Sequence, residues 1–224
     1  MLRRFENILQ NYINDIDFSQ DVVSFSELDG VTTIQISKLL HARDGQYVDI
    51  DGQQYTIAAL VGSDSFTVES VIVDPKIVTL KTPTFLYGTP MAIQKKLKTM
   101  EWREKSPFIW LYHIVWEDIY RKGPIERKVQ PILFFLDAAD KLEDTEDHFD
   151  IVIDRMRNLA EFIYEYVEKD WKYFEDWNKY RQISHADFGK FVADQGHKSD
   201  LLGEKLSGVE TRPEIDVLPP FACE

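Results

Sequence analysis

The chain has 224 residues, 44% of them hydrophobic and 13% aromatic, which suffices for one large domain or for a domain with a small module. Its formal net charge of −13 argues against a protein that grips nucleic-acid phosphates. No apolar run approaches the roughly 20 residues that cross a bilayer, and the single cysteine, Cys223, leaves no partner for an intrachain disulfide.

The charge is unevenly distributed along the chain. Residues 1–80 carry 5 basic and 12 acidic side chains, residues 81–128 carry 10 and 5, and residues 129–224 carry 11 and 22. The net charges are therefore −7, +5 and −11. A basic middle between acidic flanks is either an ordinary solvated face or a means of attraction between subunits.

The first expected element is an N-terminal helix, assigned to residues 1–21. Leu2, Phe5, Leu9 and Tyr12 recur at helical spacing, with polar residues between them. The charged start lacks the apolar stretch of a secretory signal, so we expect a mature N-terminus and synthesis in a reducing cytoplasm.

Residues 22–80 predict a separate small β module, a meander or barrel. Tyr47–Ile50 and Gln53–Ile57 flank the dipeptide Asp51-Gly52, which favours a type I′ hairpin because both turn residues need positive φ. Asp74-Pro75 marks the end of the meander.

Residues 81–224 predict an α+β domain. Its expected elements are a strand at 83–87, a helix at 91–100, a strand at 108–116, a polar loop at 117–128, a strand at 129–136, an acidic connection at 137–147, a helix at 148–170, and strands at 185–192 and 209–217. Thr89 and Pro90 are a favourable N-cap and first residue for the first helix. The strand at 108–116 is apolar at both parities, which predicts cover on both faces or packing against a neighbouring subunit.

The sequence carries none of the glycine-rich, Walker, nucleophile-elbow or zinc-protease signatures. Its histidines show no metal-ligand spacing, and they stand at positions 41, 113, 148, 185 and 197. We interpret His113 as a core residue. His185 and Asp187 would share one strand face, which leaves a catalytic dyad as an alternative. We expect a non-enzymatic protein with no cofactor and no metal ion.

Two further clusters have a plain and a functional interpretation. The acidic run from Asp137 to Asp150 lacks the residue order of an EF-hand, so a solvated loop is the simpler reading. The aromatic residues between Trp102 and Tyr120 would either stack on bases or pack in a core or interface, and their apolar pattern favours packing.

Several short motifs resemble one family. They are Phe85-Leu86-Tyr87-Gly88-Thr89-Pro90, then Ser106-Pro107-Phe108-Ile109-Trp110-Leu111, and an ending that runs from Leu206-Ser207-Gly208-Val209-Glu210 to Cys223. The pattern is similar to that of tailed-bacteriophage neck proteins, the tail terminators and head-tail connectors, in which an LxGVE turn precedes the last strand. The likeness covers roughly residues 84–224; the β module at 22–80 departs from a minimal terminator and resembles the small barrels of adaptor subunits.

The resemblance implies an α+β fold with an antiparallel sheet, helices packed on one face, and a long hairpin that reaches a neighbouring subunit. It also implies a virion protein that forms a ring of six or twelve copies, contacts other neck, portal-adaptor and tail-tube proteins, and lets DNA pass without binding it. The subunit-contact candidates are Arg121, Lys122, Arg127 and Lys128 in the basic middle. No membrane contact is expected. The alternatives are a monomeric protein-binding adaptor of a bacterium or prophage and, from His185 and Asp187, an enzyme acting on a small polar substrate.

Overall fold

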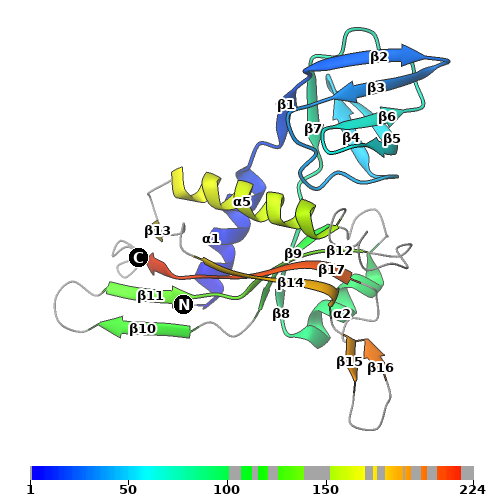
Figure 1. Ribbon diagram of the computed structural model, residues 1–224. Coiled ribbons are helices and arrows are strands. Elements are labelled where there is room, and N and C mark those ends of the chain that lie inside the picture. Colours follow the sequence, from blue (N-terminus) through cyan, green and yellow to red (C-terminus); the bar gives the residue numbers. More distant parts are fainter. Residues whose placement is uncertain are drawn as a thin grey trace. The chain divides into compact units, whose positions relative to one another are not determined.

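The computed structural model describes residues 2–100, 107–112, 116–120, 126–138, 152–169, 174–175, 180–188, 190–192, 198–200 and 206–217. The chain is a mixed α+β protein with mostly antiparallel strands, and it forms two compact units (Figure 1). One unit consists of Asp15–Thr82, and the other joins Met1–Asn14 to Pro83–Glu224. The first unit contains the range 22–80 in which the sequence predicts a β module.

The unit Asp15–Thr82 is a curled, seven-stranded antiparallel sheet with the order β1-β7-β4-β5-β6-β3-β2. Its strands are β1 (Ser19–Asp21), β2 (Ser24–Leu28), β3 (Val31–Gln35), β4 (Tyr47–Ile50), β5 (Gln53–Val61), β6 (Ser65–Val68) and β7 (Ile77–Leu80). Alternate residues of these strands point inward and form the core of the unit, as Ile34, Val48, Phe66 and Val78 show.

The sheet curls because two segments of the chain, β1–β2 and β5, each pair with two different strands. β1 and β2 are consecutive in the chain, but β1 pairs with β7 whereas β2 pairs with β3. At the bend between them, the Val22 N–H donates to the Lys76 carbonyl at 2.8 Å and the Val23 N–H donates to the Gln35 carbonyl at 2.8 Å. On the opposite side, the first half of β5 pairs with β4 and the second half pairs with β6, with a register shift between Ile57 and Ala59.

Two hairpins of this unit turn on an Asp-Gly dipeptide. Asp51 and Gly52 have φ angles of 52° and 85°, and Asp29 and Gly30 have φ angles of 53° and 81°. These values belong to the type I′ turn that the sequence predicts at Asp51-Gly52. The Asp51 carboxylate also accepts the backbone N–H groups of Lys76 and Ile77, and thereby ties its turn to the start of β7.

The second unit is built on a five-stranded sheet with the order β14-β17-β12-β9-β8. Its strands are β8 (Thr84–Gly88), β9 (Phe108–Tyr112), β12 (Leu133–Ala138), β14 (Tyr180–Phe188) and β17 (Leu206–Pro213). All pairs are antiparallel except β8 with β9, which are parallel. A parallel edge strand departs from the fully antiparallel sheet that the family resemblance implies; the helix between β8 and β9 lets the chain return in the same direction.

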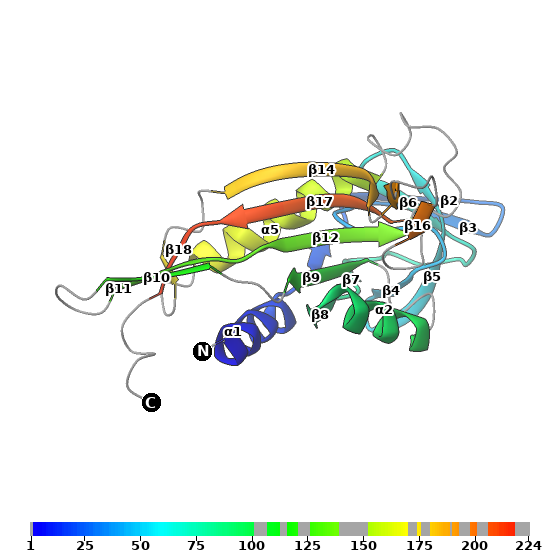
Figure 2. The ribbon, with the colours of Figure 1, turned by 90° about the horizontal axis from the view of Figure 1, so that it is seen from below.

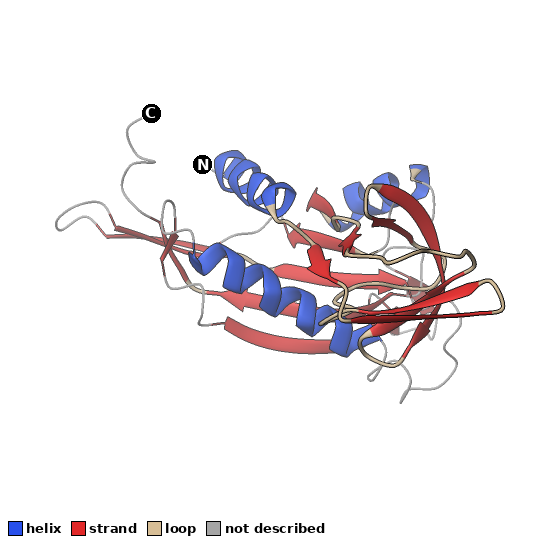
Figure 3. Cartoon of the chain, turned by 90° about the horizontal axis from the view of Figure 1, so that it is seen from above, coloured by secondary structure: helices blue, strands red, loops and turns tan. Residues whose placement is uncertain are grey.

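Helices cover both faces of this sheet, which corrects the expectation of helices on one face. α2 (Pro90–Thr99) packs Ile93 and Leu97 into a core cluster with Trp110 and Phe134. α5 (Asp154–Lys169) lies on the other face, where Tyr164 contacts Phe135 edge to face. α5 lies behind β12 and β17 in Figure 2 and in front of them in Figure 3. The reason is local, because successive residues of β12 point to opposite faces and both carry large apolar side chains.

α1 (Leu2–Asp15) belongs to this second unit and lies toward its β8–β9 side in Figures 2 and 3. It buries Phe5, Leu9 and Ile13, as the helical spacing predicts. The helix ends before the predicted limit at residue 21. Ile16 and Phe18 are buried at a spacing of two, which is a strand pattern, and the Ser19 N–H bonds the Asp17 carboxylate.

Another hairpin lies between β9 and β12 in the chain. Its strands are β10 (Trp116–Tyr120) and β11 (Glu126–Gln130), which pair over five residues each. They lie in a four-stranded sheet with the order β10-β11-β18-β13, in which β13 is Phe174–Glu175 and β18 is Ile215–Val217. The hairpin extends beyond the five-stranded sheet (Figure 2).

The late strands differ from their predicted bounds. The segment predicted at 185–192 divides into the end of β14 and the short β15 (Lys190–Val192), which pairs with β16 (Lys198–Asp200). β17 already begins at Leu206, so the expected LxGVE turn is part of a strand. Gly208 is required there, because a Cβ at this position would lie 2.0 Å from the Phe135 carbonyl oxygen.

Candidate functional site: the charged face of β14 and β17

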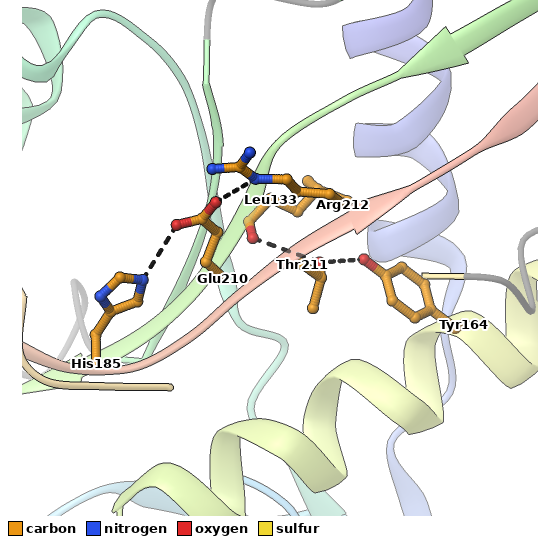
Figure 4. Close-up of polar contacts among 6 residues, drawn as sticks. All are labelled: Leu133, Tyr164, His185, Glu210, Thr211 and Arg212. Atoms are coloured by element: carbon orange, nitrogen blue, oxygen red, sulfur yellow. Dashed lines mark hydrogen bonds and ion pairs between the residues drawn. The ribbon is translucent and has the colours of Figure 1, made fainter. Parts of the chain in front are cut away.

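Three ionisable side chains meet on the face of the β14–β17 pair that looks away from α5 (Figure 4). Glu210 lies between the other two, and only 8% of its side chain is exposed. Its Oε2 is 3.1 Å from His185 Nε2, and its Oε1 accepts a hydrogen bond of 2.5 Å from Arg212 Nε. Both carboxylate oxygens are therefore engaged, and among the described residues the guanidinium of Arg212 is held through its inner nitrogen.

The register places two arginines side by side beyond this trio. Arg181 on β14 is the direct cross-strand partner of Arg212 on β17. Both side chains are exposed, and Arg181 has no hydrogen-bond or ion-pair partner in the part of the chain that the structure describes. Like charges directly opposite each other on a sheet are destabilising. Ile183, the next residue on this face of β14, is 44% exposed.

The opposite face of the same strands is sealed by α5. The Tyr164 hydroxyl donates to Thr211 Oγ1, and the Thr211 hydroxyl donates to the Leu133 carbonyl at 3.4 Å (Figure 4). Arg157 of α5 bonds Ser184 of β14 at 2.8 Å. These contacts fix the helix to the strands that carry the charged face.

Burial governs the titration of the tyrosines on the α5 face. Complete burial raises the pKa of Tyr164 far above its usual range, so this residue stays a neutral hydrogen-bond donor. Burial, followed by the carboxylates of Glu161 and Glu165, raises the pKa of Tyr180. The two glutamates are exposed, lie one turn apart on α5, and are close enough to Tyr180 of β14 to act on its phenol.

The predicted site residues fall in different places. Arg127 and Lys128 lie on β11, where they are the register partners of Val217 and Asp216. Arg121 and Lys122 lie outside the described residues.

The pairing of β14 with β17 shifts its register between His185 and Phe188, and the suggested dyad of His185 and Asp187 stays a prediction. His185 contacts Glu210, from 25 residues further along the chain. The side chain of Asp187 lies outside the described set. Sequence reasoning missed Glu210 because only the pairing of β14 with β17 brings it to His185.

The other candidate clusters are largely structural. Phe108 and Trp110 are buried in the core cluster, Trp110 donates its Nε1 hydrogen to the Gly88 carbonyl at 2.9 Å, and Trp102 lies outside the described residues. Asp137, expected in a solvated loop, is 1% exposed in β12, while residues 139–150 are outside the described part. His113 is likewise outside it.

Within the described ranges, no group of three His, Cys, Asp or Glu side chains is arranged to hold a metal ion. No helix of those ranges is long and apolar enough to cross a membrane. A groove of about 480 Å³ lies on the unit Asp15–Thr82, lined by Tyr47, Tyr55 and Glu69 among others. It contains none of the predicted site residues.

Comparison of the chain with protein-family models and with curated proteins finds no match. The arguments about function therefore rest on the sequence motifs and on the geometry described above.

Proposed function

We propose that this chain is a structural subunit of a bacteriophage neck, where copies of it form a ring that joins the head to the tail and lets DNA pass. The observation that carries the proposal is the β10–β11 hairpin. It extends the chain beyond the five-stranded sheet, and β10 forms one edge of its own four-stranded sheet. A projecting strand edge is a ready surface for another chain.

The charges of the hairpin suit a contact between copies. Arg127 and Lys128 lie on β11, and Arg121 and Lys122 lie in the sequence between β10 and β11. This basic segment belongs to a chain with a net charge of −13, so it is suited to contact an acidic surface of the next copy. A head-to-tail contact between two different surfaces is also what a closed ring requires.

The unit Asp15–Thr82 supplies a second surface for a partner ring. All five residues of β2 are exposed, and apolar side chains gather on and near this edge strand, as Val23, Phe25 and Leu28 show with exposures of 64%, 44% and 74%. Exposed apolar groups on a soluble unit commonly mark protein contacts. The acidic excess of residues 1–80 and 129–224 suits a lumen for DNA, because negative charge repels phosphates.

The test is assembly of the purified chain, measured by light scattering coupled to size exclusion and by particle imaging. We expect rings of six or twelve copies. Reversal of the four basic residues, R121E, R127E, K122E and K128E together, is expected to weaken assembly at least about tenfold, since each lost interfacial ion pair also leaves a like charge behind.

A matched control reverses four exposed lysines that are not part of the hairpin, namely Lys38, Lys95, Lys96 and Lys98. It makes the same change in net charge and is expected to leave the rings intact. Equal behaviour of the two variants contradicts the assignment of the hairpin. A wild-type chain that stays monomeric at high concentration contradicts the ring itself and favours the alternative, a monomeric protein-binding adaptor that uses the exposed β2 edge.

A further inference from the structure

The arginine pair on the charged face is arranged to bind two carboxylates. Arg181 has no partner among the described residues, and in that part of the chain the Glu210 carboxylate contacts His185 and Arg212. Arg212 presents its terminal nitrogens outward while its Nε is held. Such a pre-oriented guanidinium is suited to bidentate binding of a carboxylate, and an acidic group between the two arginines would relieve their repulsion.

The same unit carries a complementary pair on α5, which covers the opposite face of the sheet. Glu161 and Glu165 are exposed on α5, and neither has a hydrogen-bond or ion-pair partner in the described chain. Their spacing of four residues sets their Cβ atoms about 6 Å apart. Directly opposed residues on neighbouring strands, such as Arg181 and Arg212, have Cβ atoms about 5 Å apart. The two pairs therefore match in spacing and are opposite in charge.

Within one copy the two pairs lie on opposite faces of the sheet. Thr211 points to Tyr164 of α5, and its neighbour Arg212 points to the opposite face of the sheet (Figure 4). The strand β14, with Tyr180 on the α5 face and Arg181 on the other, thus lies between the arginines and the glutamates of the same chain. Complementary surfaces on opposite sides of one unit are the arrangement that a head-to-tail ring uses.

We propose that Arg181 and Arg212 of one copy bind Glu161 and Glu165 of the next copy in the ring. This inference rests on the proposed ring and adds a second contact to it, distinct from the β10–β11 hairpin. The partner is a second copy, because two adjacent carboxylates of matching spacing are present on the chain itself and because Ile183 offers an apolar contact beside them.

The experiment is a charge swap in the full-length chain, with the dissociation constant of assembly measured by sedimentation velocity. R181E is expected to raise that constant about tenfold. R181E combined with E161R or with E165R inverts one pair in every copy, and at least one of these double variants is expected to return the constant to within about threefold of the wild type. K98E and E69R are the matched single-charge controls and are expected to have no effect.

Folding of the R181E variant is measured by thermal unfolding, and we expect its midpoint to stay the same or rise, because the repulsion from Arg212 is removed. The inference is overturned, with the ring intact, if R181E assembles as the wild type does or if neither double variant is rescued. If R181E lost binding to a labelled DNA duplex and still assembled as the wild type does, the arginines would be assigned to phosphates instead. A wild type that never assembles removes the ring and this contact together.

Discussion

The buried hydrogen bond between Tyr164 and Thr211 makes the stability of the fold depend on pH. The phenol is fully buried against β17, and its hydrogen bond to Thr211 continues to the Leu133 carbonyl. Because burial raises its pKa from the ordinary value of 10.0, the folded state keeps the proton when the unfolded chain loses it. The stabilising effect is complete below pH 10 and is lost as the pH rises above that value.

Tyr164→Phe is expected to lower the free energy of unfolding by about 1 kcal/mol at neutral pH, the net value of one hydrogen bond. The deficit should shrink above pH 10, since the variant has no phenol to ionise on unfolding. Urea titrations between pH 7 and 11 measure both effects. Thr211→Val is the companion variant, and it should cost more, because it leaves the buried phenol without an acceptor. A deficit that grows with pH would contradict this account.

At the same scale, the sequence could not predict the charged site. His185 and its neighbours suggest a role only through their local spacing, and the pattern pointed to Asp187. The contact with Glu210 depends on the register of β14 against β17, and a shift of one residue would send Glu210 to the α5 face. The arginine pair was hidden for the same reason, because Arg181 and Arg212 are 31 positions apart (212 minus 181) and meet only across strands.

At the scale of the element, local chemistry predicted well where it acts within a few residues. Thr89 caps α2 by accepting the Ala92 N–H, and Pro90 is its first residue, as expected. The dipeptide at Asp51-Gly52 forms the predicted hairpin. The end of α1 was missed because helical and strand patterns overlap between Tyr12 and Phe18, and the packing of the next unit decides between them.

The two Asp-Gly hairpins allow a measurement of how much the hydrogen bonds of Asp51 to the start of β7 stabilise the fold. Asp29→Ala and Asp51→Ala place alanine at nearly the same positive φ, 53° and 52°, so both variants meet the same backbone strain. Only Asp51 also accepts the N–H groups of Lys76 and Ile77. We expect Asp51→Ala to cost about 1–3 kcal/mol more than Asp29→Ala, measured by chemical denaturation of the full chain. Equal losses would show that the contact with β7 adds nothing.

On the scale of the whole molecule, the division into two compact units predicts two unfolding events. Each unit has its own core, with Ile34 fully buried in one and Leu159 in the other. Differential scanning calorimetry is expected to resolve two transitions. Ile34→Ala and Leu159→Ala should each lower one transition and leave the other within about 1 °C, since a buried large-to-small change costs about 2–5 kcal/mol in its own unit. A single transition that both variants lower would contradict this independence.

The small curled unit also begins and ends at one place. Its first strand pairs with its last, and the Leu80 N–H donates to the Phe18 carbonyl at 3.2 Å. The chain therefore leaves the larger unit after α1 and returns before β8 through two neighbouring points. An insertion closed in this way places little strain on its host. It can be exchanged for another module, or shortened to a brief turn, without a change in the sheet of the larger unit.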